Sequence, residues 1–217
     1  MGGVRAAACV DGREEGNPPA VIRSATTDDA EAIAGIYAPY VERTAITFDY
    51  EAPTPVDFEA KIARIEERHP FLVAEEDGAI LAYAYASEFK DRPAYDRSVE
   101  LSVYCDMDAR GRGLGSALYA ALESVLARQG VLNVNACIAF PASPDEYLDD
   151  ASVRFHEARG YTIVGSFHSC GFKFDRWYDM VWMEKMLGEH AAVPAPFVPF
   201  SRLPIDEVAA AISARTR

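Results

Sequence analysis

The sequence has few long apolar runs, few cysteines and few positive charges, and each shortage excludes a class of protein. No apolar run approaches the roughly 20 residues that a membrane-spanning helix needs, so we expect no membrane segment. The first 20 residues contain charges and no extended apolar stretch, and no signal peptide is predicted. The 21 Lys and Arg residues are outnumbered by 34 Asp and Glu residues, giving a formal charge of −13. This acidity disfavours nucleic acids and anionic membranes as partners.

The four cysteines stand at positions 9, 105, 137 and 170, too far apart to form a CxxC pair. Their spacing predicts neither a zinc site nor a disulfide scaffold. The histidines at 69, 168 and 190 show no metal-ligand spacing either, so no metal is expected. Reduced thiols and a cytoplasmic location are the resulting expectations.

Length and composition indicate one globular domain with tails. The chain has 217 residues, of which 50% are hydrophobic and 25% charged, and a domain usually takes about 150 residues. We expect a loose N-terminal arm over 1–19, a core domain over 20–187 and a C-terminal extension over 188–217. In this extension prolines interrupt the periodicity before a short helical end.

Apolar periodicity and turn residues predict an α+β fold, in which a central sheet is flanked by helices. Helices are predicted to begin at Thr26 and Thr54 and to span 113–129 and 152–158. Strands are predicted over 21–25, 71–76, 79–89, 98–105, 131–140, 161–167 and 176–187.

The most informative segment is DMDARGRGLGS, residues 106–116, between a predicted strand and a predicted helix. Arg110, Gly113 and Gly115 form an R-x-x-G-x-G pattern. Glycines allow a close backbone turn, and the N–H groups at a helix start bind phosphate oxygens. The spacing differs from that of a P-loop and of a dinucleotide fingerprint. The pattern therefore favours an anion site, and a tight turn without a ligand is the alternative.

The segment VELSVYCDMDARGRGLGSALYAAL resembles the acetyl-CoA motif of the GNAT N-acetyltransferase superfamily. Three further segments resemble its phosphinothricin acetyltransferase-like branch, which acetylates small amino-acid-like amines. These segments are ITFDYEAPT (46–54), SVRFHEARGY (152–161) and GFKFDRWYDMVWM (171–183). The resemblance implies a GNAT fold, with a mixed, mostly antiparallel sheet, and acetyl-CoA as co-substrate.

The resemblance also assigns contacts to the coenzyme. Backbone groups of Val103, Tyr104 and Cys105 would pair with the pantetheine arm. The family usually has an asparagine where this chain has Asp149, which lacks the amide donor. The pyrophosphate would bind a loop comprising Arg110, Gly111, Arg112, Gly113, Leu114, Gly115 and Ser116.

Direct attack of an amine on a thioester needs a base, because an alkyl ammonium titrates near ~10.4. Glu100 matches the family's V-E-x-x-V-Y pattern, and strand alternation places it on one face with Ser102 and Tyr104. Burial would raise the proton affinity of this carboxylate. The alternative is a glutamate on a solvated sheet face.

Two more residues are candidates for proton transfer. His156 matches a histidine that the family uses as a base or proton relay, and a hydrogen-bonded structural histidine is the alternative. Tyr104 could donate to the thioester oxygen or return a proton to the CoA thiolate, and a core aromatic residue is the alternative.

The resemblance places a set of candidates around the acceptor, of which Arg92 or Lys173 could pair with a substrate carboxylate. Surface or core packing is the alternative for each member of the set. The loop 139–152 carries four acids and no basic residue, and is either a solvated loop or a lid that favours cationic substrates. The acceptor-site candidates are Phe48, Arg92, Tyr95, Lys173 and Trp177.

These expectations describe an enzyme that transfers acetyl from acetyl-CoA to the primary amine of a small molecule such as phosphinothricin or methionine sulfoximine. Two alternatives stay open: acetylation of a protein N-terminus or lysine, and a non-catalytic CoA-binding module. Pairing of polar sheet edges in this branch makes a homodimer the expected assembly.

Overall fold

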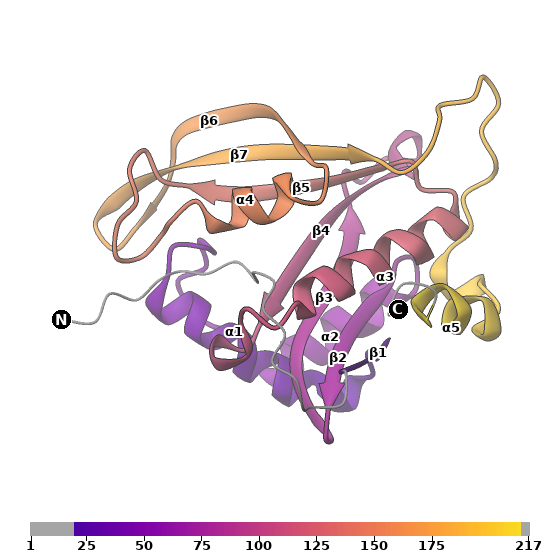
Figure 1. Cartoon of the computed structure of the whole chain (residues 1–217), viewed down its shortest axis with the longest axis horizontal. Coiled ribbons are helices and arrows are strands. Elements are labelled where there is room, and N and C mark those ends of the chain that lie inside the picture. The colour runs from indigo at the N-terminus through magenta and orange to yellow at the C-terminus, as the bar shows by residue number, and fades with distance from the viewer. Residues whose placement is uncertain (1–19, 214–217) are drawn as a thin grey trace.

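A computed structural model describes residues 20–213 and shows a seven-stranded sheet in the order β1-β2-β3-β4-β5-β7-β6 (Figure 1). All neighbouring strands are antiparallel except β4 and β5, which are parallel. The strands are β1 (Val21–Ser24), β2 (Phe71–Glu76), β3 (Ala79–Glu88), β4 (Ser98–Cys105), β5 (Asn133–Phe140), β6 (Thr162–Lys173) and β7 (Arg176–Met186). The predicted α+β fold with a mixed, mostly antiparallel sheet is confirmed.

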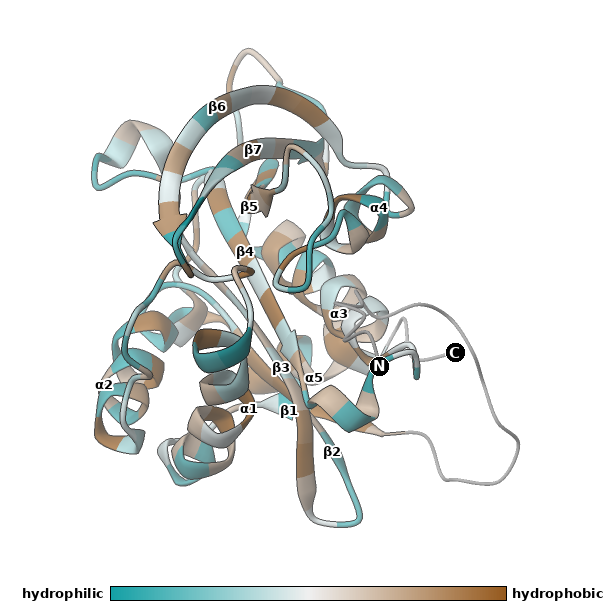
Figure 2. Cartoon of the chain, turned by 90° about the vertical axis from the view of Figure 1, so that its left-hand side faces the viewer, coloured by the Kyte–Doolittle hydropathy of each residue, from teal (hydrophilic) through white to brown (hydrophobic). Residues whose placement is uncertain are grey.

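Helices cover both faces of this sheet. Figure 2 shows α1 and α2 on one side of β2–β4 and α3 on the other. Each side has its own apolar cluster, one with Ile33 and Tyr83 under α1 and α2, the other with Leu122 and Val99 under α3. The helices are α1 (Ala30–Arg43), α2 (Pro55–Glu66), α3 (Leu114–Gln129), α4 (Ala151–Glu157) and α5 (Ile205–Ser213).

Local signals in the sequence explain several element ends. Thr54 caps α2 by accepting the Asp57 N–H, and the Asp57 carboxylate accepts the Thr54 N–H in return. Gly130 ends α3 with a φ of 82°, a left-handed conformation that favours glycine. These two predicted ends are confirmed.

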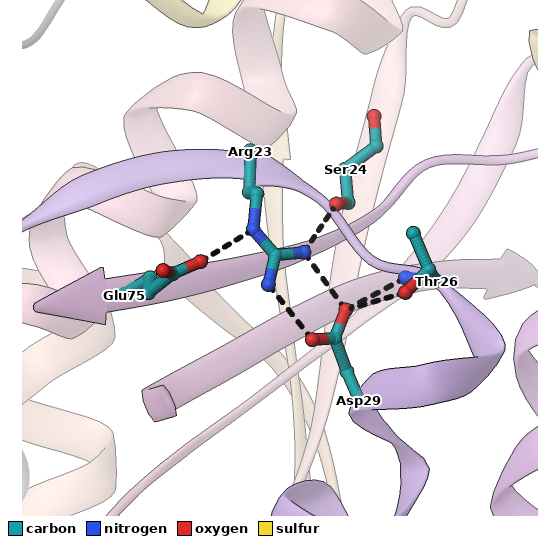
Figure 3. Close-up of polar contacts among 5 residues, drawn as sticks. All are labelled: Arg23, Ser24, Thr26, Asp29 and Glu75. Carbon is teal, nitrogen blue, oxygen red and sulfur yellow. Dashed lines mark hydrogen bonds and ion pairs between the residues drawn. The ribbon is translucent and has the colours of Figure 1, made fainter. Parts of the chain in front are cut away.

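The predicted helix start at Thr26 is confirmed, because Thr26 is the N-cap of the first helical turn and Asp28 and Asp29 lie in that turn. This first turn, residues 27–29, is a 3-10 turn, and it continues directly into α1 at Ala30. Asp29 completes the cap, because its carboxylate accepts both the backbone N–H and the hydroxyl of Thr26. Arg23 binds both oxygens of Asp29 at 2.8 Å and Glu75 at 2.7 Å, so the start of α1 is anchored to β1 and β2 (Figure 3).

Strand β6 ends at Lys173, six residues later than the sequence pattern predicted. Register shifts lie between Ile163 and Gly165 and between Phe167 and Gly171, and they break the alternation on which the prediction depended. The resulting β6–β7 hairpin arches away from β1–β3 (Figure 1).

The C-terminal segment packs against the rest of the chain. Val208, Ala211 and Ile212 of α5 are buried in the apolar cluster that contains α3. Gln129 and Val198 exchange two hydrogen bonds, from the Val198 N–H to the Gln129 carbonyl and from Gln129 Nε2 to the Val198 carbonyl. The predicted arm over 1–19 lies outside the described residues, as do 214–217.

Within 20–213, no helix has both the length and the apolarity to cross a membrane. The same residues contain no group of three or more potential metal ligands. Cys105, Cys137 and Cys170 form no disulfide there, and Cys9 lies outside the described part.

Candidate active site

The candidate site lies where β4 and β5 separate. The two strands are paired only at Ser98, Val99 and Glu100 on β4, opposite residues 133–135 of β5. Beyond Glu100 a cavity of about 100 Å³ opens between them, lined by 101–105 on β4 and 136–139 on β5. A parallel pair that splits in this way exposes backbone groups of both strands to a ligand.

The two faces of the sheet contribute different walls to this cavity. Tyr40 and Ile46 line it from the side of α1, whereas Tyr119, Phe155 and His156 line it from the side of α3 and α4. Glu100, Ser102 and Tyr104 point toward the α1 and α2 side, because Tyr104 belongs to the apolar cluster on that side and strand residues alternate.

The loop between β4 and α3 has the geometry of an anion site. Gly111 and Gly113 both have positive φ, 81° and 78°, and Gly113 caps α3, so the first N–H groups of the 16-residue helix point into the turn. In the first turn of α3, Leu114 and Gly115 are buried and Ser116 is half-buried.

The two arginines of this loop have different surroundings. The Arg110 guanidinium lies 4.9 Å from the centre of the Tyr40 ring, and its buried Nε and Nη2 atoms have no hydrogen-bond partner among the described residues. Arg112 instead forms an ion pair with Glu76 at 2.6 Å. Unsatisfied buried guanidinium N–H groups beside a helix N-terminus are suited to phosphate oxygens.

Glu100 is half-buried at the last position where β4 pairs with β5. Desolvation raises the pKa of its carboxyl group, and the positive charge of Lys90 partly opposes this rise. A carboxylate whose proton affinity is raised is a stronger base than an exposed one.

His156 is buried on α4 and lines the cavity beside Tyr119. Its Nδ1–H donates to the Ser152 carbonyl at 2.7 Å, so Nε2 carries the lone pair and accepts the Tyr119 hydroxyl proton at 2.9 Å. Burial lowers the pKa of His156 to about 4. The imidazole is therefore neutral at pH 7.

Tyr104 lies within a group of aromatic rings on the α1 and α2 side. Its ring is 4.8 Å from Tyr37, 5.0 Å from Tyr40 and 5.4 Å from Tyr83. Desolvation raises the pKa of Tyr104 well above its usual value, so its hydroxyl stays protonated and acts as a donor. Val103 and Tyr104 line the cavity, as does Cys105, whose N–H and C=O groups both bond to the Tyr40 hydroxyl.

The acids of the loop 139–152 bind groups of the protein itself. Arg176 forms ion pairs with Asp145 at 2.9 Å and with Glu146 at 2.8 Å, and Arg154 pairs with Asp150. Asp149 lines the cavity, but its Oδ1 accepts the Ala151 N–H at 2.8 Å at the start of α4. Because these acids are paired within the protein, the hypothesis of an acidic lid for cationic substrates is not supported. The sequence pattern could not reveal the pairing with Arg176, which is about 30 residues away along the chain.

The five acceptor-site candidates lie in three separate segments. Lys173 is buried and donates from Nζ to the Thr47 carbonyl at 2.8 Å, next to Phe48. Arg92 and Tyr95 are exposed in the connection between β3 and β4.

Trp177 is 63% exposed on β7 and contacts the Phe172 ring. Burial lowers the pKa of Lys173 although Asp49 opposes this. Because the Lys173 ammonium group is buried and donates to the Thr47 carbonyl, Lys173 is a poor partner for a substrate carboxylate.

Two residues of the site were missed in the sequence. Lys90 lies with Nζ 5.7 Å from the Trp182 ring centre, and its charge acts on Glu100. Its position directly after the strand 79–89, which pairs with the Glu100 strand, is the signal that could have found it. Tyr119 was hidden in an apolar helix pattern, and a hydroxyl on that buried face is a weak signal.

Comparisons with known proteins agree with this geometry. Residues 22–182 match the family model described as "Acetyltransferase (GNAT) domain". The phosphinothricin N-acetyltransferase of Streptomyces viridochromogenes is 36% identical over 185 residues, which are 85% of this chain and 97% of that protein. The L-methionine sulfoximine/L-methionine sulfone acetyltransferase of Salmonella typhimurium is 33% identical over 178 residues, 80% of this chain and 98% of that protein.

A solved structure shows the same similarity in three dimensions. The phosphinothricin acetyltransferase of Sinorhizobium meliloti, crystallised with AcCoA, has a TM-score of 0.75 and 32% identity. The alignment covers 86% of this chain and 98% of that one. The resemblance seen in the motifs is thereby confirmed, and the chain belongs to the GNAT acetyltransferase family.

Proposed function

We propose that this protein transfers the acetyl group of acetyl-CoA to the primary amine of a small amino-acid-like acceptor, of the phosphinothricin or methionine sulfoximine type. The observation that carries the proposal is the separation of β4 from β5 directly after Glu100, which opens a cavity beside a carboxylate of raised pKa. The printed activities of the relatives point to the same acceptor class.

The residues present fit the coenzyme. Arg110 supplies buried guanidinium N–H groups that have no partner among residues 20–213, and the α3 N-terminus supplies backbone N–H groups for a pyrophosphate. Val103 and Tyr104 line the cavity in the part of β4 that is not paired with β5, and they would hold the pantetheine arm. When bound, acetyl-CoA supplies the activated acetyl thioester.

Glu100 would take the proton from the acceptor ammonium, directly or through a water molecule. Its side chain points to the α1 and α2 side, so the amine would approach from there while the coenzyme lies nearer to α3 and α4. Lys90 would favour the ionised form of Glu100, because its charge opposes the effect of burial on the pKa of Glu100. Attack is direct, and close positioning of the two substrates supplies much of the rate.

His156 and Tyr119 would act as one unit on the coenzyme side. The neutral imidazole accepts a hydrogen bond from the Tyr119 hydroxyl, which fixes the direction of that hydroxyl in the cavity wall. Tyr104, held protonated by burial, is our candidate donor to the thioester oxygen or to the departing thiolate.

We further propose a catalytic domain over 20–187 with the arm 1–19 and the extension 188–217 as additions, a cytoplasmic location and a homodimer. Support for a dimer comes from β6, an edge strand whose apolar side chains Ile163, Val164 and Phe167 are each about half exposed. Light scattering of the purified protein tests the dimer, and a monomeric mass would contradict it.

A thiol-release assay tests the proposed reaction. Acetyl-CoA would be offered with phosphinothricin, methionine sulfoximine, methionine sulfone, free amino acids and a short peptide. We expect release of CoA with at least one small amine. Acetylation of the peptide alone would favour a protein acetyltransferase, and coenzyme binding without thiol release would indicate a non-catalytic module.

A further inference from the structure

Three segments that are distant in sequence are bonded to one another on the α1 and α2 side of the cavity: residues 44–50, 145–149 and 171–178. We call them the acceptor-side wall. The first segment follows α1, the second belongs to the loop before α4, and the third is the end of the β6–β7 hairpin. Ile46, Leu148 and Asp149 are the members of the wall that line the cavity.

The segment after α1 is bonded directly to the hairpin. Lys173 Nζ donates to the Thr47 carbonyl at 2.8 Å, and the Tyr50 hydroxyl donates to the Phe172 carbonyl. Phe48 packs so closely on Gly171 that an added Cβ there would overlap its ring. These contacts hold the two segments against each other.

The loop before α4 is bonded to the same hairpin through Asp145 and Tyr147. Asp145 accepts from Arg176 Nη1 and the Tyr178 hydroxyl, each at 2.9 Å, while its other oxygen accepts the N–H groups of Tyr147 and Leu148. Although burial acts to raise it, these donors hold the pKa of Asp145 below its usual range.

Tyr147 completes the connection among all three segments. Its ring stacks on Phe174 with centres 4.2 Å apart, and the Arg176 guanidinium lies 5.1 Å above it. Its carbonyl accepts the Ala45 N–H at 3.1 Å. Leu148, only 1% exposed, is thereby held in the cavity wall.

We propose that the acceptor-side wall selects acceptors by size: it admits a free amine of amino-acid dimensions and excludes a polypeptide that continues beyond the first residue. This inference rests on the proposed function, because it assumes that the amine reaches Glu100 from the side that the wall encloses. Arg176 and Tyr147 are positioning residues that hold the loop 145–149 in place.

Coenzyme conjugates test this without requiring turnover. CoA joined through an acetyl linker to the amino group of alanine, and to that of Ala-Ala-Ala, would be titrated calorimetrically against the whole protein, with CoA alone as reference. For the native protein we expect the alanine conjugate to bind at least tenfold more tightly than the tripeptide conjugate. In the double variant Arg176→Ala/Tyr147→Ala this ratio should fall to threefold or less, with the affinity for CoA unchanged.

A matched control and a structural readout make the result interpretable. Arg128→Ala removes a different arginine ion pair, the one between Arg128 on α3 and Glu207 on α5. This variant should keep the native ratio of the two conjugate affinities. Limited proteolysis should show new cleavage within 141–150 only in the double variant. If cleavage appears and the ratio does not change, the wall does not select acceptors.

Failure of the wall and failure of the proposed function give different results. Equal affinity of both conjugates for the native protein overturns the wall. If the alanine conjugate binds no more tightly than CoA, the proposed acceptor class is contradicted. Size selection by the wall then predicts that the tripeptide conjugate binds more weakly than CoA. If it binds as tightly as CoA, the wall is overturned as well.

Discussion

Replacing Glu100 with Gln tests the base on which the proposed chemistry depends. Gln has nearly the same shape but cannot accept a proton. An acceptor ammonium with a pKa near ~10.4 must lose its proton before attack, which costs about 4–5 kcal/mol at pH 7. A positioned base typically contributes 10²–10⁴ in rate. We therefore expect kcat for Glu100→Gln to fall at least about 100-fold at pH 7.

The pH dependence separates loss of a base from loss of structure. At pH 10 roughly 30% of the amine is already deprotonated in solution, so the deficit should shrink to about tenfold or less. The native enzyme should lose activity in acid at a pH above the ordinary Glu value of 4.5, because desolvation raises the pKa of Glu100. Thiol release from pH 5 to 10, with CoA affinity measured in parallel, provides the data.

Glu59→Gln, the same substitution at an exposed position of α2 outside the cavity lining, is the matched control and should keep the native profile. Native turnover of Glu100→Gln at pH 7, or an equal deficit at every pH, would refute Glu100 as the base.

Three further predictions follow from the same geometry. Lys90→Met removes the charge that opposes burial, so the pKa of Glu100 should rise and the acid limb of kcat/KM should move to higher pH; a limb that stays in place would disprove this link. His156 should remain neutral down to about pH 5, since burial lowers its pKa to about 4, and an NMR titration that finds an imidazole of ordinary pKa would contradict the buried pairing with Tyr119. Gly130→Ala forces a Cβ into a left-handed position 3.1 Å from the Pro196 carbonyl oxygen and should destabilise the fold by about 1–2 kcal/mol in urea unfolding, whereas Gly35→Ala, in open space on α1, should stabilise it by up to ~1 kcal/mol; the reverse order would refute the reasoning.

Interactions between residues that are close in sequence made much of the fold predictable. Thr54 with Asp57 marks the start of α2, and Gly130 marks the end of α3, because caps and left-handed glycines act through residues that are neighbours in sequence. Thr26 marks the first helical turn in the same way, whereas the ion pair that anchors Asp29 to Arg23 is a contact that no local pattern shows. The length of β6 was underestimated because its register shifts disrupt alternation.

For the site, the sequence by itself determined the glycine turn around Gly113 and the strand position of Glu100, since both depend on short motifs and alternation. Only the tertiary structure decided which charges act together. It brought Lys90 to Glu100, linked His156 to Tyr119, and placed Lys173 and the acids of the loop 139–152 against internal partners. The physical reason is that burial and Coulomb interactions depend on distances between segments that are far apart along the chain, and the packing of the elements sets those distances.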